Sequence, residues 1–171
     1  LIGGDIFVYN GKVILWGLLN CHRDSTVNPL VPVGKSYPLL LDEQDKLEVE
    51  NTLQSMVDKL GIRFGSVNVE LVVDKMGKVW PIDVGPRAGG NMIPDLLGLI
   101  FDVDVVEMAV LTAMGEEINN EVHDGIPFYA THNLHTSHTG SYKTIDFSKK
   151  LDEKIIKTVS YTHLRAHETK A

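Results

Sequence analysis

The chain has 171 residues, a formal net charge of −7 and 43% hydrophobic residues. This length fits one domain, and the acidic balance argues against general nucleic-acid binding. No apolar run is long enough for a membrane helix. The single cysteine, Cys21, excludes an internal disulfide and a cysteine-based zinc site. A cytoplasmic protein is the default expectation, and the sequence predicts no particular oligomeric state.

The first predicted element is a β-hairpin near the N-terminus. A strand over residues 5–9 leads to Asn10-Gly11, a pair typical of a type I′ turn. The return strand is predicted to run from Lys12 to about Asn20. Asp5, at the start of the first strand, is interpreted as an ordinary strand-end residue.

A loop and a helix follow the hairpin. Residues 21–41 contain three prolines and are predicted to be a loop with short extended pieces. Asp42 can cap a helix over roughly residues 43–60, and Gly61 suits its end. The apolar residues of this segment recur at helical spacing, so the helix is expected to pack on the sheet.

A second hairpin, over residues 67–84, carries the most informative pattern. Its first strand alternates apolar residues with Asn68 and Glu70, so these two polar side chains share a face. Turns of two or four residues give the same register, which places Glu70 opposite Asp83 and Asn68 opposite Gly85. Pro81 indicates irregular pairing in the return strand.

Opposed carboxylates on a sheet are unfavourable unless something relieves their repulsion. Their β-carbons would lie about 5 Å apart, which suits a shared Mg²⁺ that takes its other ligands from water or phosphate. The alternative is a pair relieved by a nearby arginine, or one in which a carboxyl keeps its proton. The hairpin alone does not separate these interpretations.

The segment after the hairpin favours the metal-binding interpretation of the carboxylate pair. Gly89 and Gly90 precede a predicted helix start, with Asn91 as a possible cap and Pro94 in the first turn. Small residues before a helix expose backbone N–H groups that bind anions. Arg87 adds a permanently charged fork suited to phosphate or carboxylate. Together these groups are typical of phosphoryl transfer.

This pattern resembles the ATP-grasp superfamily, near the branch of carbamoyl-phosphate-synthase-like proteins and amino-acid ligases. The resemblance covers about residues 3–118 and, more loosely, 126–150. It implies that Glu70 and Asp83 hold Mg²⁺, or Mn²⁺ in its place, on the phosphates of ATP. It implies that Arg87 is the catalytic contact to the transferred phosphate or the acyl phosphate. The residues expected at the cofactor or acyl pocket are Gly89, Gly90 and Asn91 from this pattern, and Asn68 from the register of the hairpin.

Two residues depart from the family pattern. Asp83 stands where the family usually has the longer glutamate, and Gly85 stands where it usually has an asparagine that ligates metal. Because Asn68 is predicted to lie opposite Gly85, we expect its amide to fill the space that Gly85 leaves.

The implied fold class is α+β: an ATP-grasp C-terminal lobe with a mainly antiparallel sheet and packed helices, incomplete at the N-terminus. The later chain is predicted to form a helix near residues 93–100 and another that Asp102 caps and Gly115 ends. Its buried stripe is expected to be Val103, Val106, Val110 and Ala113. Strands are predicted at 127–135 and 141–147, and a helix at 149–157.

The predicted organisation has three parts. Residues 1–118 form the catalytic lobe, 119–159 an extension of that lobe, and 160–171 a non-native tail that resembles translated adaptor sequence. Upstream parts of the family fold have no counterpart in the sequence, so the partner expected first is a missing N-terminal lobe of the same chain. The chain alone is therefore expected to be inactive.

The predicted function is that of an ATP-dependent carboxylate–amine (or thiol) ligase acting through an acyl phosphate. Its substrates would be a small carboxylate and an amine. One alternative is a carbamoyl-phosphate-synthase or carboxylase type that uses bicarbonate, and another is a non-catalytic nucleotide-binding relative.

Other polar residues receive simpler interpretations. His132, His135 and His138 are expected to be polar residues of a strand surface, and His22 with Arg23 a solvated loop start. Lys35 lies in Gly-Lys-Ser without the spacing of a phosphate-binding loop.

Overall fold

A computed structural model describes residues 1–24, 32–119, 121–123, 125, 128–134, 140 and 144–159. The chain divides into two compact units, Leu1–His135 and Thr136–Ala171. The predicted boundaries at residues 118 and 159 stay predictions, and the predicted tail lies outside the described residues. Within the described part, no helix is both long and apolar enough to span a membrane.

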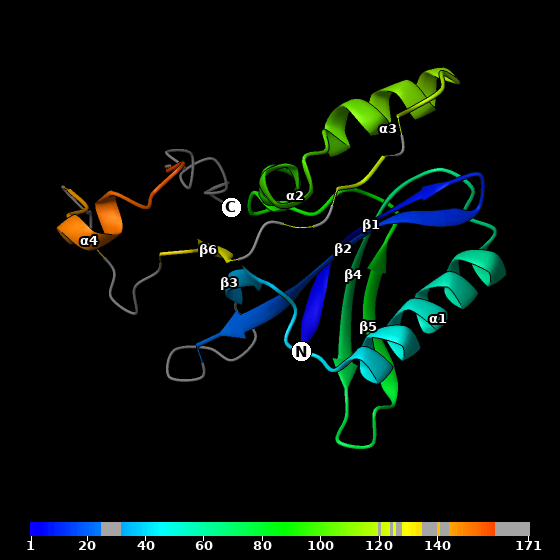
Figure 1. The fold of residues 1–171 in the computed structure, drawn as a ribbon, viewed down its shortest axis with the longest axis horizontal. Helices are drawn as coiled ribbons and strands as arrows, with labels where there is room; N and C mark the ends of the chain where they lie inside the picture. Colours follow the sequence, from blue (N-terminus) through cyan, green and yellow to red (C-terminus); the bar gives the residue numbers. More distant parts are fainter. Residues whose placement is uncertain are drawn as a thin grey trace, which may run out of the picture. The chain divides into compact units, whose positions relative to one another are not determined.

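The first unit is built on a six-stranded antiparallel sheet (Figure 1). The strand order across the sheet is β5-β4-β1-β2-β3-β6. The α+β class with a mainly antiparallel sheet is therefore confirmed. The strands are β1 (Ile2–Tyr9), β2 (Lys12–Arg23), β3 (Pro32–Tyr37), β4 (Gly65–Val73), β5 (Val79–Gly85) and β6 (Tyr129–His132).

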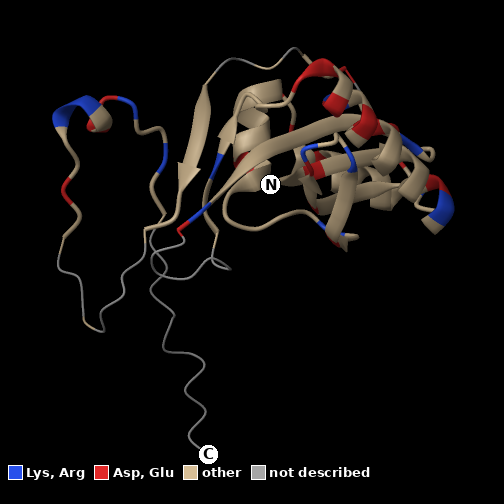
Figure 2. Cartoon of the chain, turned by 90° about the horizontal axis from the view of Figure 1, so that it is seen from below, with Lys and Arg blue, Asp and Glu red and all other residues tan. Residues whose placement is uncertain are grey.

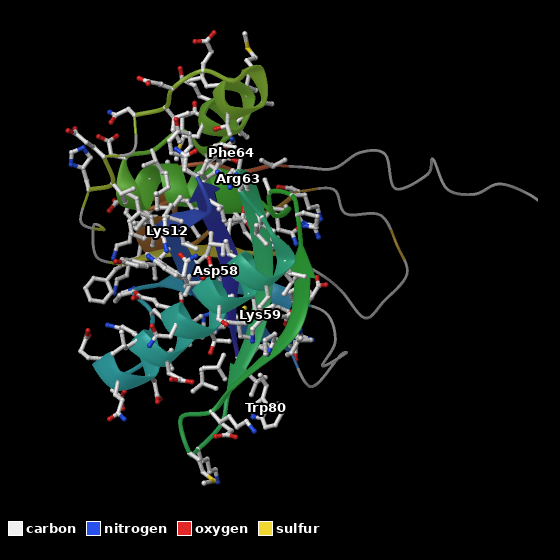
Figure 3. The ribbon with its side chains drawn as sticks, turned by 90° about the vertical axis from the view of Figure 1, so that its right-hand side faces the viewer. Lys12, Asp58, Lys59, Arg63, Phe64 and Trp80 are labelled. Carbon is white, nitrogen blue, oxygen red and sulfur yellow. The ribbon has the colours of Figure 1, made fainter. Side chains whose placement is uncertain are left out.

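Helices cover both faces of this sheet. The helix α1 (Glu43–Leu60) packs on one face, as Figure 3 shows, with Leu53 at the centre of a buried cluster. On the other face lie α2 (Ile93–Phe101) and α3 (Val105–Met114) with a second cluster around Phe7 and Leu97. Leu97 lies so close to β2 that a β-carbon on Gly17 would be 2.5 Å from it. Alternating strand residues thus feed two separate cores.

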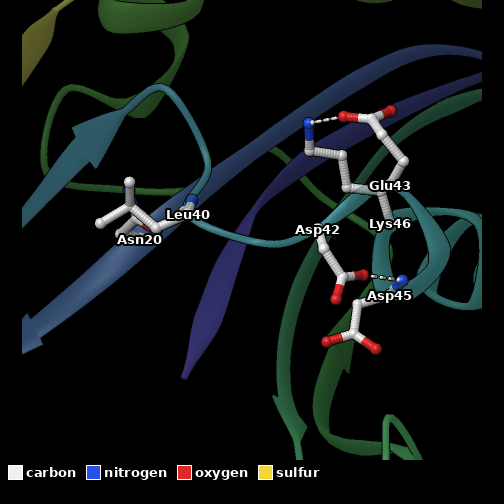
Figure 4. Close-up of polar contacts among 6 residues, drawn as sticks. All are labelled: Asn20, Leu40, Asp42, Glu43, Asp45 and Lys46. Atoms are coloured by element: carbon white, nitrogen blue, oxygen red, sulfur yellow. Dashed lines mark hydrogen bonds and ion pairs between the residues drawn. The ribbon is translucent and has the colours of Figure 1, made fainter.

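The bounds and caps of α1 match the sequence prediction. The Asp42 carboxylate accepts a hydrogen bond from the Asp45 backbone N–H at 2.8 Å (Figure 4), and Gly61 ends the helix at φ 67°. Nearby, the Asn20 side chain accepts from the Leu40 N–H at 2.9 Å, which fixes the approach to the helix. Local signals were sufficient here because capping depends on neighbouring residues.

The caps of α2 and α3 differ from the prediction. Met92, at φ 62°, precedes α2, so Asn91 is not its cap, whereas Pro94 does lie in the first turn. Asp102 ends α2 in a left-handed conformation instead of starting α3. Asp104 starts α3, and its carboxylate accepts from the second and third N–H groups of the helix. Gly115 ends α3 as predicted.

The buried stripe of α3 also differs from the predicted one. Val105 and Met108 are buried, whereas Val106 and Val110 are 59% and 53% exposed. Both stripes of this helix are apolar, so spacing could not decide which of them faces the sheet.

Several strand and helix bounds differ as well. β1 starts at Ile2, β2 continues to Arg23, and β3 occupies part of the predicted loop because it pairs with both β2 and β6. β6 is shorter than the predicted strand at 127–135. Residues 144–147 form no strand, and 141–143 lie outside the described residues.

The second unit contributes one described helix, α4 (Lys149–Asp152), shorter than the predicted helix at 149–157. Figure 2 shows basic and acidic residues on this helix, whose sequence contains Lys149, Lys150 and Asp152. None of its residues is buried.

Candidate functional site

The β4–β5 hairpin places Glu70 opposite Asp83 and Asn68 opposite Gly85, as predicted. The route to this register differs from the prediction. The loop has three residues, since Asp74 N–H donates to Lys78 O at 3.0 Å. Such a loop alone would shift Asp83 by one position. A bulge at Ile82, next to Pro81, restores the register.

The carboxylate of Glu70 forms an ion pair with Arg23 at the end of β2. The two side chains are about equally accessible, at 27% and 26% exposure, and Asp83 is exposed. His22 and Arg23 were interpreted as a solvated loop start, but both lie in β2. Arg23 faces the predicted metal site, and His22 Nε2 lies 2.7 Å from Ser36 Oγ.

These donors fit Mg²⁺ in one particular way. Among the described residues, no group of three or more His, Cys, Asp or Glu side chains gathers to form a metal cage. A pair of carboxylates is nevertheless the usual protein contribution when phosphate oxygens and waters complete an octahedral shell. The site can therefore hold a magnesium ion that arrives with a phosphate, in exchange for the Arg23 contact.

Asp5 organises the turn beside this pair, and its interpretation as an ordinary strand-end residue is wrong. It lies inside β1 and is 1% exposed. One carboxylate oxygen accepts from Asn68 Nδ2 at 2.7 Å, and the other accepts from Gly89 N–H at 2.8 Å. A β-carbon on Gly89 would lie 2.7–2.8 Å from these partners and from Ile93, so only glycine fits. The buried charge thus fixes the turn to the sheet.

The Asn68 amide nitrogen also donates to Gly4 O at 3.0 Å. Its nitrogen is therefore committed to β1, and the proposed role of its oxygen at the metal stays a prediction. The space beside Gly85 is bordered by the Arg87 side chain, which a β-carbon there would meet at 3.7 Å. This is ordinary contact, so Arg87 and Gly85 pack side by side.

Arg87 is exposed and held by its own turn. Its Nη1 donates to Ala88 O at 3.0 Å, and its carbonyl accepts from Asn68 N–H at 2.9 Å. Gly90 and Asn91 follow on the exposed side, with Asn91 in a left-handed conformation at φ 53°. The Gly89 N–H already donates to Asp5. Of the three backbone N–H groups of Gly89, Gly90 and Asn91, only the last two could therefore bind an anion.

A pocket of about 420 Å³ joins all the predicted site residues except Gly89. Glu70, Asp83 and Arg87 line this pocket together with Lys35 and Cys21. Sequence reasoning missed Lys35, whose Nζ lies 2.8 Å from Cys21 Sγ. The full lining is Cys21, Arg23, Pro32, Gly34, Lys35, Asn68, Val69, Glu70, Asp83, Arg87, Gly90, Asn91, Ile93, Thr131 and Asn133.

Gly3 lies in the sheet next to residues that line the pocket. Gly3 pairs with Glu70 on one side and with Leu19 on the other. A β-carbon at Gly3 would lie 3.2 Å from Lys35 Nζ and 3.3 Å from Cys21 Sγ. It would also lie 2.6 Å from a carbonyl oxygen of the backbone, so the site requires glycine.

Three histidines were expected on a strand surface. Of these, His132 lies in β6 opposite Gly34, and His135 and His138 lie outside the described residues.

Comparison with known proteins supports this fold. No protein-family model matches the chain. A curated uncharacterized protein of Sinorhizobium fredii is 38% identical over 84 residues, which cover 49% of this chain and 17% of that protein.

Solved structures match over a larger part of the chain. L-amino acid ligase from Bacillus licheniformis matches with a TM-score of 0.71 and 19% identity over 89% of this chain. Phosphoribosylglycinamide synthetase from Anaerococcus prevotii gives 0.62 and 22% over 68%, and biotin carboxylase from Campylobacter jejuni gives 0.58 and 20% over 69%. The matches span 39%, 29% and 26% of those chains.

The chain therefore has an α+β fold that it shares with part of each of these three enzymes. The fold that the sequence resemblance implied is thus confirmed. At these identities the likeness establishes the fold and leaves the reaction to be argued from the site.

Proposed function

We propose that this chain provides part of the active site of an ATP-dependent ligase that joins a carboxylate to an amine or a thiol. The observation that carries the proposal is the cross-strand pair of Glu70 and Asp83 in one pocket with Arg87. The name of the L-amino acid ligase, whose structure matches over most of this chain, agrees with it.

In the proposed reaction, a substrate carboxylate oxygen attacks the γ-phosphorus of ATP, and the bond to ADP breaks. The amine nitrogen then attacks the acyl carbon, phosphate leaves, and the nitrogen loses its proton. Glu70 and Asp83 would hold Mg²⁺, which neutralises phosphate charge when bound. Arg87 would stabilise charge on the transferred phosphoryl group and on the developing oxyanion. Asp5 would keep the Gly89 turn in place.

The test uses the longest natural polypeptide that contains residues 1–159 of this sequence. Mg²⁺-dependent ADP release is measured with a panel of amino acids as carboxylates and amines, and separately with bicarbonate. Glu70→Gln, Asp83→Asn and Arg87→Ala should each lower kcat/KM at least about 100-fold, because each removes charge stabilisation of the transition state. Glu117→Gln, in an exposed loop, is the matched control. Near-normal rates in all three site variants would contradict the assignment.

A specific observation favours a second candidate, a nucleotide-binding protein without catalysis. Arg23 already neutralises Glu70, as the alternative interpretation of the carboxylate pair requires. This candidate predicts that ADP and ATP bind in the presence of Mg²⁺ while no ADP is released with any acceptor. ADP release that depends on bicarbonate alone would instead indicate a carboxylating enzyme.

A further inference from the structure

We infer that Lys35 forms a binding site for the carboxylate group of a substrate, in the same pocket as Glu70 and Asp83 and beside Gly3, the β1 partner of Glu70. The term substrate rests on the proposed function. The existence of the anion site does not depend on it, and it can be tested without ATP or metal.

The register across the sheet places this site. Asp83, Glu70 and Gly3 are partners on three adjacent strands, and Cys21, Lys35 and Thr131 are partners on the next three. Cys21 N–H donates to Leu1 O at 3.2 Å, so the two rows meet near the start of β1. All residues of the two rows except Gly3 line the same pocket. Three strand spacings, about 14 Å, separate the backbone of Lys35 from that of Glu70. The Lys35 side chain spans most of this distance, since its Nζ lies 3.2 Å from where a β-carbon on Gly3 would be.

The two cations of the pocket have different environments. Arg23 is paired with Glu70, whereas no ion pair among the described residues involves Lys35. The Lys35 side chain is partly buried, and its Nζ contacts the Cys21 thiol at 2.8 Å. A partly buried ammonium without a carboxylate partner is stabilised by an anion. The absence of a side chain at Gly3 leaves room for this ammonium and thiol, which a β-carbon there would approach to 3.2 and 3.3 Å.

The position favours a carboxylate over a phosphate at Lys35. Phosphate oxygens are expected at Glu70 and Asp83, which can share a metal, and at Arg87, which is exposed. The carboxylate that attacks the phosphate must lie next to it. The Lys35 ammonium, beside the β1 partner of Glu70, is placed to hold that carboxylate. Thr131, whose Oγ1 accepts from Lys35 N–H at 3.2 Å, adds a hydroxyl beside it.

Cys21 is the one cysteine of the chain, so its alkylation reports on Lys35. The experiment compares the rate of alkylation of the 171-residue chain by iodoacetate, which is a small carboxylate, with that by neutral iodoacetamide. The ratio of the two rates cancels any general effect of Lys35 on thiol reactivity. The same ratio in urea-unfolded chain provides a reference that does not depend on any variant folding.

We expect the folded chain to favour iodoacetate at least about threefold relative to the unfolded reference, because the ammonium attracts the carboxylate at short range. Lys35→Arg should keep this preference, and Lys35→Gln should lose it. Acetate at constant ionic strength should slow the iodoacetate reaction of the wild type. Equal ratios in folded, unfolded and variant chains would overturn the site. Protection by inorganic phosphate but not by acetate would overturn its assignment to a carboxylate.

These results are separate from the proposed function. Loss of the iodoacetate preference with ATP-dependent turnover intact would reject the Lys35 site alone. A preserved preference without turnover in the longest natural polypeptide would reject the ligase assignment alone.

Discussion

Asp5 shows how much one buried side chain controls in this site. Its carboxylate accepts from a side chain of β4 and from the backbone of the turn after β5. Replacing it with Ala would leave the Gly89 N–H without this acceptor in a protein interior. We expect Asp5→Ala to lower the free energy of unfolding by about 1–3 kcal/mol. Urea unfolding measures this change, with Glu117→Ala as an exposed control.

A second readout separates local from global damage at Asp5. The Gly89 amide should exchange with solvent faster in Asp5→Ala than in the wild type at equal overall stability. If exchange and stability both stay unchanged, the carboxylate does not hold the turn.

Arg23 gives the second prediction at this scale. Its ion pair with Glu70 must break before a metal can use both oxygens of that carboxylate. We expect Arg23→Gln to tighten Mn²⁺ binding by roughly three- to tenfold, since it removes a competing cation. Free Mn²⁺, followed by electron paramagnetic resonance, measures the affinity. Lys12→Gln, at the other end of β2, makes the same charge change away from the pocket.

Glu70→Gln should remove this metal binding in either background. Unchanged or weaker binding in Arg23→Gln would show that the arginine does not compete for Glu70.

The residues that sequence reasoning missed share one property. Asp5 and Lys35 have unremarkable local neighbours, and their roles arise from strands far away in the chain. Glu70, Asp83 and Arg87 could be identified from the sequence because a hairpin sets its register locally. The roles of these five residues in catalysis and binding stay predictions.

Among the elements, the β4–β5 hairpin has a register that depends on both its loop and the bulge at Ile82. Asp74 accepts from Met76 N–H at 2.8 Å, Lys78 N–H at 3.1 Å and Trp80 Nε1 at 2.9 Å. Figure 3 shows Trp80 near this turn, and the Lys78 ammonium lies 4.0 Å from the centre of its ring. The expected pairing of Glu70 was correct because turn and bulge offset each other.

This turn has a defined pH dependence. The hydrogen bond from Trp80, followed by the one from Met76, lowers the pKa of Asp74 below its ordinary value. The stabilisation is therefore complete above the ordinary aspartate pKa and is lost as the pH falls through the lowered one. We expect Trp80 fluorescence to change in that acidic range. Asp74→Asn should lack the transition, and Trp80→Phe identifies the signal against Trp16. A transition that persists in Asp74→Asn would contradict the assignment.

The helices show where local pattern is enough. The predicted helix over roughly residues 43–60 agrees with α1 because its cap and its final glycine are local signals, and Val49, Leu53 and Val57 form its buried stripe. α3 has apolar residues on two stripes, so its orientation came from packing against the sheet. Gln54 adds a tether that no local pattern indicates: its Oε1 accepts from Val13 N–H, and its Nε2 donates to Gly11 O, both at 3.0 Å.

At the scale of the whole first unit, one sheet separates two cores. The sequence indicated an antiparallel α+β fold, but the assignment of α1 to one face and of α2 with α3 to the other depends on contacts between distant segments. The pocket lies on the α2 face, since Glu70 and Asn68 point away from the core that contains Val67 and Val69. The site is therefore supported by both cores through the strands they share.

This arrangement predicts cooperative unfolding of the first unit. Val57 belongs to the α1 core and Ile100 to the α2 core, at 2% and 1% exposure. Val57→Ala and Ile100→Val should each lower the free energy of unfolding, by about 1–3 and 0.5–1.5 kcal/mol. The exposed Val106→Ala should cost less than about 0.5 kcal/mol.

Because the cores lie on opposite faces without shared side chains, the two losses should add within about 0.5 kcal/mol in the double variant. Urea denaturation followed by circular dichroism and by tryptophan fluorescence should give one coincident transition in every variant. Two separated transitions, one sensitive to Val57→Ala and the other to Ile100→Val, would show that the faces unfold independently. The carboxylate pair on β4 and β5 would then depend on the α1 core alone, since these two strands contribute Val67, Val69, Leu71 and Val79 to it.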